Sequence, residues 1–418
     1  MEDNNTDIDH DHEEQQQAAA DQRRLYLISL LQGKKTCIKR TGNKIDELVV
    51  EFLVKTENDL HDHLCCNKAG DDYQGLDKDR DTEQEVEATI RFFPNVLSRK
   101  KKACMWSGRE DQTWVEYGHS MYPLHFLFSL CLPGGRDSSK YICNLKAVSF
   151  VPIVARLAIE LDRRPRGGLL TKGITRNHAR GKALQSLMMS SHLINHDNNT
   201  EHHRLVDNEF LTVMIRLRKM GLLKKKDVCV KELVARICCE ETVFAENRFQ
   251  FLVEWNPIAL TQVGDISGYT PLHYAASFST LQGFRMVLEY GIRYFPRKKG
   301  ISLLFKKCKK ITLLNPLGTI NAPFQLACER FGYEQVMQVI DYNAPQLNII
   351  EALLSVAIDE EIRLDCVYFL LRREPNVLVN FMMSSSVGVS CSNDDNDDTN
   401  SDENENEKHN ESEHLTNE

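Results

Sequence analysis

The side chains best suited to metal chemistry lie in the stretch HDHLCC, which runs from His61 to Cys66. Imidazole and thiolate groups are preferred zinc ligands, but a structural zinc site needs two ligand pairs, each with about two to four residues between its members. No second pair with that spacing is present in the sequence. We therefore expect no metal at this stretch and no cofactor in this protein.

Signatures of catalysis are missing as well. The stretch LPGGRDSSK at 132–140 lacks the spacing of glycines around a lysine that phosphate-binding loops require. His125 and His273 each follow a Pro-Leu pair at an expected helix start, where a hydrogen-bonded structural histidine is the simpler interpretation. The sequence thus predicts a protein that is not an enzyme.

Cysteine usage and hydropathy indicate a protein of the cytoplasm or the nucleus. The 13 cysteines include no C-x-x-C pair, which is typical of reduced thiols. The N-terminus is acidic and has no basic start followed by an apolar stretch, so no secretory signal is expected. The longest apolar stretch, AVSFVPIVARLAIEL, contains Arg156 and is too short to span a membrane.

Charge is distributed very unevenly along the 418 residues, whose net charge is −8. Residues 1–22 hold eight Asp and Glu and no Lys or Arg, and Asn393–Glu418 holds eleven acids against Lys408. The remaining chain has 51 Lys and Arg against 41 Asp and Glu. Acidic blocks of this kind are typically disordered. We predict disordered ends at 1–22 and 383–418, which either solubilise the protein or mask a basic surface.

Apolar residues recur at helical spacing in short blocks, which predicts a chain of helix pairs. We expect divergent helical repeats over 23–161, a flexible connection over 162–204 and a second set of repeats over 205–382. Two phrases recur within these blocks. One ends a helix at a proline, as RFFPNVL, VEWNPIAL and RREPNVL, and the other starts a helix, as YPLHFLFS, TPLHYAAS and APFQLACE. Proline is well tolerated at the first helical position, so the second phrase predicts helix starts at Pro123, Pro271 and Pro323.

Residues 265–292, DISGYTPLHYAASFSTLQGFRMVLEYGI, resemble an ankyrin repeat. In this interpretation glycine permits a tight turn and threonine caps the first helix, while the two alanines let the helices approach closely. A final glycine would stop the second helix in a left-handed conformation. The residues that carry the resemblance are Gly268, Thr270, Pro271, Leu272, His273, Ala275, Ala276 and Gly291.

The resemblance implies an all-α fold, an ankyrin-like solenoid of stacked antiparallel helix pairs with long insertions between repeats. The match is specific over 265–292 and looser over about 205–380. The spacing departs from the family's period of about 33 residues, because the equivalent positions Ile237, Ala275, Ala327 and Ala357 are 38, 52 and 30 residues apart.

The function that this resemblance implies is a non-catalytic scaffold that binds another protein, one with an acidic surface or segment. Two insertions, at 95–121 and 297–321, fall where the family has its hairpin fingers, and both are basic. Tryptophan and arginine are favoured anchors at interfaces. The expected contact residues are Arg99, Lys100, Lys101, Lys102, Trp106, Trp114, Arg297, Lys298 and Lys299. The alternative is a helical protein that binds nucleic acid through a basic surface, although no nucleic-acid-binding motif is present.

Overall fold

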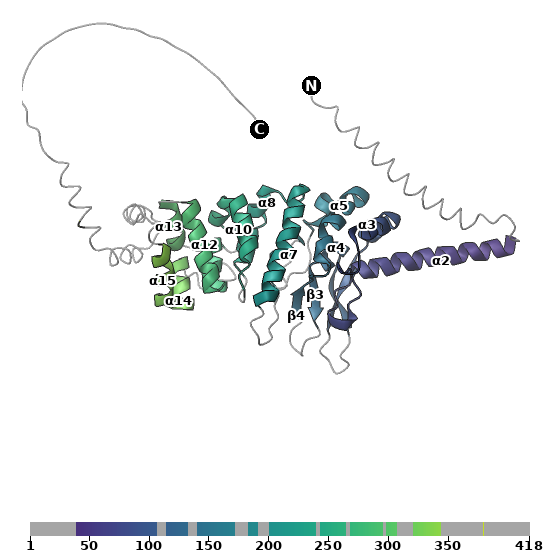
Figure 1. The fold of residues 1–418 in the computed structure, drawn as a ribbon, viewed down its shortest axis with the longest axis horizontal. Coiled ribbons are helices and arrows are strands. Elements are labelled where there is room, and N and C mark those ends of the chain that lie inside the picture. The colour runs from purple at the N-terminus through teal and green to yellow at the C-terminus, as the bar shows by residue number, and fades with distance from the viewer. Residues whose placement is uncertain are drawn as a thin grey trace, which may run out of the picture.

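A computed structural model describes residues 39–106, 114–132, 140–171, 183–190, 200–239, 243–264, 268–295, 298–306, 321–343 and 379. The protein is mostly helical, as the sequence predicts. Its helices lie side by side in a long row, which runs in Figure 1 from α3 at one end to α14 and α15 at the other. The expected ends at 1–22 and 383–418 lie outside the described residues.

Two layers of helices form the row. In one layer each helix packs against the next, in the order α3 (Glu83–Phe92), α5 (Val151–Asp162), α7 (Thr200–Lys219), α10 (Glu246–Trp255) and α12 (Leu281–Tyr294). In the other, α9 (Leu233–Ile237), α11 (Pro271–Phe278) and α14 (Pro323–Phe331) are neighbours. Contacts of α9 with α10 and of α11 with α12 join the layers. The remaining helices are α2 (Lys39–Leu64), α4 (Pro123–Phe126), α6 (Ala183–Ser186), α8 (Lys225–Val230), α13 (Lys298–Phe305) and α15 (Tyr333–Asn343).

The three predicted helix starts are confirmed, and they share one geometry. Pro123, Pro271 and Pro323 are the first residues of α4, α11 and α14. The residue before each proline is extended, with φ between −78° and −84° and ψ between 156° and 166°. Proline disfavours the helical region for its predecessor, so the same sequence phrase sets the same chain direction three times.

The helix-ending phrase is confirmed at two of its three positions. α3 ends before Phe93 and α10 before Asn256, and in each case the following proline opens a 3₁₀ helix, η2 (Pro94–Leu97) or η5 (Pro257–Thr261). Phe93 has φ −120° and ψ 66°, and Phe295, at the end of α12, has φ −124° and ψ 67°. The third phrase, at 372–378, lies outside the described residues.

One hydrophobic core runs through the whole row, from Leu64 near the end of α2 to Ile340 in α15. The predicted flexible connection, 162–204, contributes to this core, because Leu169, Leu184 and Leu187 are completely buried. Two more 3₁₀ helices, η3 (Val148–Phe150) and η4 (Pro165–Gly168), lie on either side of α5. The two predicted sets of repeats therefore share one core.

The all-α prediction misses two β-hairpins. β1 (Lys101–Trp106) pairs antiparallel with β2 (Trp114–Met121), and β3 (Ser129–Leu132) pairs antiparallel with β4 (Lys140–Cys143). β1 contacts β3, so the two small sheets are neighbours. The β1–β2 hairpin fills the slot between Pro94, which follows α3, and Pro123, which starts α4. In the described part of the predicted insertion 95–121, the strands β1 and β2 therefore form a hairpin.

Two glycines of the repeat signature have different roles. Gly268 has φ +72°, so the turn before α11 uses the predicted backbone freedom. Gly291 was predicted to end its helix, and this is wrong, because α12 continues to Tyr294. A Cβ atom at Gly291 would lie 3.1 Å from Cδ1 of Leu303. The missing side chain thus gives α13 room to pack against α12.

α2 leaves the row at the end formed by α3 and projects away from it (Figure 1). Leu48, Phe52 and Val54 are more than half exposed along this helix. Within the described ranges, no helix is both long enough and apolar enough to cross a bilayer.

Candidate partner-binding surface

The base of the β1–β2 hairpin packs in a small hydrophobic core of its own. Cys65 directly after α2, Ala103 from β1, Met121 from β2 and Phe126 from α4 form a hydrophobic cluster separate from the main core. Each is at most 9% exposed. Because these four residues come from four different parts of the chain, their packing fixes the base of the hairpin relative to the helical row.

The basic residues at the hairpin base divide into paired and exposed ones. Lys101 forms an ion pair with Asp62, with its Nζ 2.8 Å from Oδ1. Lys100 lies over the ring of Tyr122, 4.8 Å from the centroid, while Arg164 lies 3.4 Å from the same centroid. The side chains of Lys100 and Lys102 are exposed, and Arg99 is half-buried. Lys100 and Lys102 are therefore the predicted contact residues that offer accessible charge.

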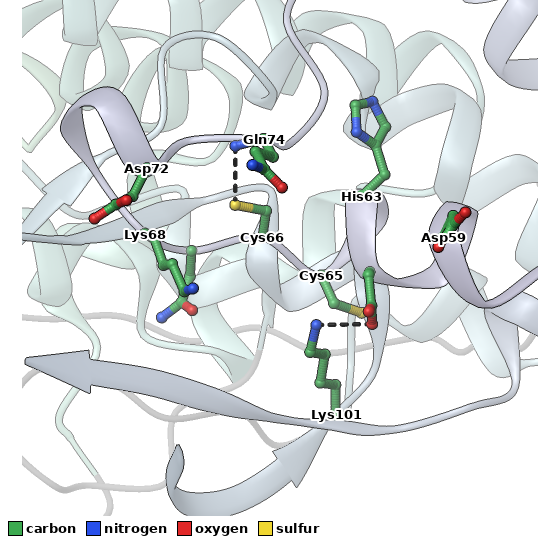
Figure 2. A pocket seen from close by; sticks show the side chains of 10 residues that line it. Asp59, His63, Cys65, Cys66, Lys68, Asp72, Gln74 and Lys101 are labelled. Atoms are coloured by element: carbon green, nitrogen blue, oxygen red, sulfur yellow. Dashed lines mark hydrogen bonds and ion pairs between the residues drawn. The ribbon is translucent and has the colours of Figure 1, made fainter. Parts of the chain in front are cut away.

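A polar cavity of about 430 Å³ opens beside the hairpin base. Figure 2 shows its wall, formed by the end of α2, the segment after it and β1. The dashed line from Lys101 marks its ion pair with Asp62, and the backbone N–H of Gln74 donates to Sγ of Cys66 over 3.4 Å. The lining residues are Asp59, Asp62, His63, Cys65, Cys66, Asn67, Lys68, Asp72, Gln74 and Lys101.

One thiol and one imidazole near this cavity, those of Cys65 and His61, are buried. Burial raises the pKa of the Cys65 thiol well above its usual range, so the reactive thiolate is disfavoured. Burial also lowers the pKa of His61, whose Nε2 lies 3.6 Å from Sγ of Cys65. His63 lies 3.5 Å from Oδ2 of Asp81 and does not face Cys65. Among the described residues, no group of three or more His, Cys, Asp or Glu side chains is placed to hold a metal ion.

The structure does not bring the predicted contact residues together. Trp106 and Trp114 are cross-strand partners at the end of the β1–β2 ladder. Lys298 and Lys299 lie in the first turn of α13, while Arg297 lies outside the described residues. α13 is at the opposite end of the row from the hairpins (Figure 1). The described parts of the two basic insertions therefore lie far apart along the row.

The described part of the second insertion, 297–321, also differs from the hairpin finger that the sequence predicted. Its first part is the helix α13, which packs against α12 and α14. Leu303, Leu304 and Phe305 are nearly completely buried. These three residues are part of the core, which leaves the β1–β2 hairpin as the better candidate for a contact surface.

The residues of the repeat signature are buried and serve the fold. Nδ1 of His273 accepts from the backbone N–H of Thr270 over 3.2 Å and lies 2.8 Å from its Oγ1. Burial lowers the pKa of His273 to about 4. Leu272, Ala275 and Ala276 are at most 1% exposed. The ring of His273 is therefore neutral and holds the start of α11, as a structural histidine would.

The same hydrogen bond recurs at another helix start with a different side chain. Oε1 of Gln325 accepts from the backbone N–H of Ala322 over 3.1 Å, three residues before it, as His273 does for Thr270. At the third start, Nδ1 of His125 lies 3.3 Å from the carbonyl oxygen of Tyr122. Burial lowers the pKa of His125 too. Each of the three starts is thus tied to the side chain three residues later.

Tyr122 is a residue of this surface that the sequence analysis does not select. Its ring lies under both Lys100 and Arg164, which are 22 and 42 residues away along the chain. Only the position of Tyr122, directly before Pro123 in a repeated phrase, sets it apart in the sequence.

The chain was also compared with known proteins. No family model, no curated protein and no solved structure matches it.

Proposed function

We propose that this protein is a non-catalytic scaffold that binds another protein, and that its helical row is a divergent ankyrin-repeat stack. The observation that carries this proposal is the helix start repeated at Pro123, Pro271 and Pro323 on helices that lie along one row. In repeat proteins each unit contacts its neighbours and together they bury one core, which leaves an extended surface for binding.

The position of the β1–β2 hairpin supports the same proposal. It lies between a helix-ending proline and a helix-starting proline, the slot in which ankyrin repeats carry their binding fingers. The hairpin base is rigid, because its own core anchors it, and it presents Lys100 and Lys102 to solvent. Exposed cations on a rigid base attract an acidic partner at long range and raise its association rate.

A charge-removal experiment on the full chain tests this function. The unsubstituted chain is immobilised and exposed to cell lysate, with and without nuclease, and the retained proteins are identified by mass spectrometry. The test variant is Lys100→Gln with Lys102→Gln. The control is Lys44→Gln with Lys55→Gln, which removes the same charge from two exposed positions on α2.

If the proposal is right, the unsubstituted chain retains a small set of proteins even after nuclease treatment. The hairpin variant should retain less of these proteins, and the α2 control should retain as much as the unsubstituted chain. Retention that disappears after nuclease treatment would establish the alternative, a basic surface for nucleic acid. A steep dependence of binding on salt would agree with that alternative, because each neutralised phosphate releases counterions. Equal retention by both variants would exclude the hairpin base as the contact surface.

A further inference from the structure

A second basic surface lies where α7 ends and α8 begins, and the proposed function does not use it. Arg218 and Lys219 are in the last turn of α7, and Lys224, Lys225 and Lys226 surround the start of α8. All five side chains are exposed. We refer to these five residues as the α7–α8 basic cluster.

The charge of this cluster is not compensated nearby. Among the residues that the structure describes, none forms an ion pair with any member of the cluster. Asp227, the one carboxylate in the sequence from 218 to 230, is buried and pairs with Arg166. At the hairpin base, by contrast, Lys101 is neutralised by Asp62. The α7–α8 basic cluster therefore presents five exposed cations, none of which is paired with a described carboxylate.

Contacts with the end of α10 hold the cluster in place. The guanidinium of Arg218 lies 4.4 Å from the ring centroid of Trp255. The side-chain amide of Asn256 donates to the carbonyl oxygen of Lys225 over 3.1 Å and lies 3.3 Å from Sγ of Cys229. Two neighbouring residues of the α10–η5 turn thus fix both halves of the cluster, the end of α7 and the start of α8.

The sequence contains a segment of opposite charge. Residues 393–418, which we call the acidic tail, hold eleven Asp and Glu against one Lys. About 50 residues separate α15 from this tail, a length that spans at most ~165 Å when fully extended. α8 packs on α9, and α9, α11 and α14 are neighbours, so three interaxial spacings of about 8–10 Å separate α8 from α14. The tail can therefore reach the cluster easily.

We propose that the acidic tail docks on the α7–α8 basic cluster and covers it. Because both belong to one chain, the tail meets the cluster at a high effective concentration, and many weak charge contacts are enough to hold it. Three apolar side chains near the cluster are exposed, those of Met220 directly after α7, Val230 at the end of α8 and Ile258 on the adjoining η5. A docked tail would therefore compete with any other acidic molecule for a surface that is both basic and apolar.

Carbodiimide cross-linking of the full chain tests the contact, since this reagent joins a lysine amine to a carboxylate only when the two touch. Equal amounts of isotope-labelled and unlabelled chain distinguish links within a chain from links between chains. We expect tail peptides joined within one chain to Lys219, Lys224, Lys225 and Lys226. These links should be lost at 1 M salt, where the screening length is about 3 Å. Exposed Lys100 and Lys102 serve as internal controls, and links to them as frequent as those to the cluster would overturn the proposal.

A second measurement asks whether the tail acts at the cluster or only through net charge. Four full-length chains are eluted from a heparin column by salt. They are the unsubstituted chain, a chain with each tail Asp→Asn and Glu→Gln, the variant Lys224→Gln, Lys225→Gln, Lys226→Gln, and the combination of both changes. When the cluster lysines are present, neutralising the tail should move elution to a higher salt concentration. When the three lysines are replaced, neutralising the tail should move elution much less. Equal shifts in both backgrounds would contradict docking. Neither measurement involves a partner protein, so the outcome is independent of the scaffold function.

Discussion

Arg248 on α10 donates from Nε to Oδ1 of Asp207 on α7 across 2.8 Å, and both side chains are almost completely buried. Oδ2 of Asp207 also accepts from the backbone N–H of Asn247 over 2.7 Å. Nη1 of Arg248 donates to the carbonyl oxygens of Leu187 and Met189. One ion pair thus joins two helices of the row to the segment that precedes them.

Replacing Arg248 by methionine should destabilise the protein strongly. Arg248→Met removes one partner of a buried pair and leaves the carboxylate of Asp207 buried without a cation, which costs about 3–5 kcal/mol. Urea unfolding of the full chain measures the change in the free energy of unfolding. The control is Arg204→Gln, which breaks an exposed pair with Glu201 and should cost under about 1 kcal/mol. Similar losses in the free energy of unfolding would show that the buried ion pair stabilises the protein no more than the exposed pair does.

The neutral state of His273 predicts how stability depends on pH. An unfolded histidine has a pKa of about 6.5, whereas the folded value is about 4. Between these values the unfolded chain binds a proton that the folded chain does not bind. Stability should therefore fall as pH is lowered from about 6.5 toward 4, by up to about 3 kcal/mol from this residue.

The variant His273→Gln should reduce that pH dependence, because glutamine does not titrate. Gln325 already makes the equivalent hydrogen bond at the start of α14, so the substitution is compatible with the local geometry. Unfolding midpoints in urea at pH 7 and pH 5 measure the effect. A variant as sensitive to acid as the unsubstituted chain would assign the pH dependence to other groups, among them His125.

Truncating Phe126 should loosen the hairpin base. Phe126→Ala removes the largest side chain of the small core shared with Cys65, Ala103 and Met121, and loss of a buried phenylalanine side chain costs about 3–5 kcal/mol. Hydrogen exchange of the β1 amides should accelerate more than exchange in α10. The exposed residue Val230 provides the control, since Val230→Ala should leave both rates unchanged.

Gly268 should tolerate asparagine better than alanine. Its φ of +72° lies in the left-handed region, where a Cβ atom is unfavourable and asparagine is the best-tolerated residue that has one. Gly268→Ala should cost about 1 kcal/mol or more, and Gly268→Asn less. Thermal unfolding of the two variants gives the comparison. Equal melting temperatures would mean that the turn can change its conformation without cost.

Local signals in the sequence predicted the parts of the fold that depend on a few adjacent residues. The starts of α4, α11 and α14 and the ends of α3 and α10 are set by a proline and its predecessor, so the phrase alone is sufficient. The turn at Gly268 is also predicted from a few adjacent residues. The positions of these elements in one row required the structure.

Features that depend on distant partners could not be predicted. The strand β1 begins with two lysines, and its pairing with β2 is stabilised by packing against Cys65 and Phe126 rather than by an alternating pattern. Gly291 resembles a helix stop in the sequence, but its role depends on Leu303 from the next helix. The separation of the two basic insertions is a feature of the same kind, because Lys298 opens a helix at the far end of the row from the hairpins.

The number of residues between a helix-ending proline and the next helix-starting proline varies greatly along the chain. The helices on either side of this slot nevertheless pack in one row. Between Pro257 and Pro271 it holds 13 residues, and between Pro94 and Pro123 it holds 28, among them the strands β1 and β2. Doubling the length of a loop costs only about 0.6 kcal/mol in closure entropy. A segment inserted in the sequence between β1 and β2 should therefore cost little in stability and leave the packing of the helices unchanged.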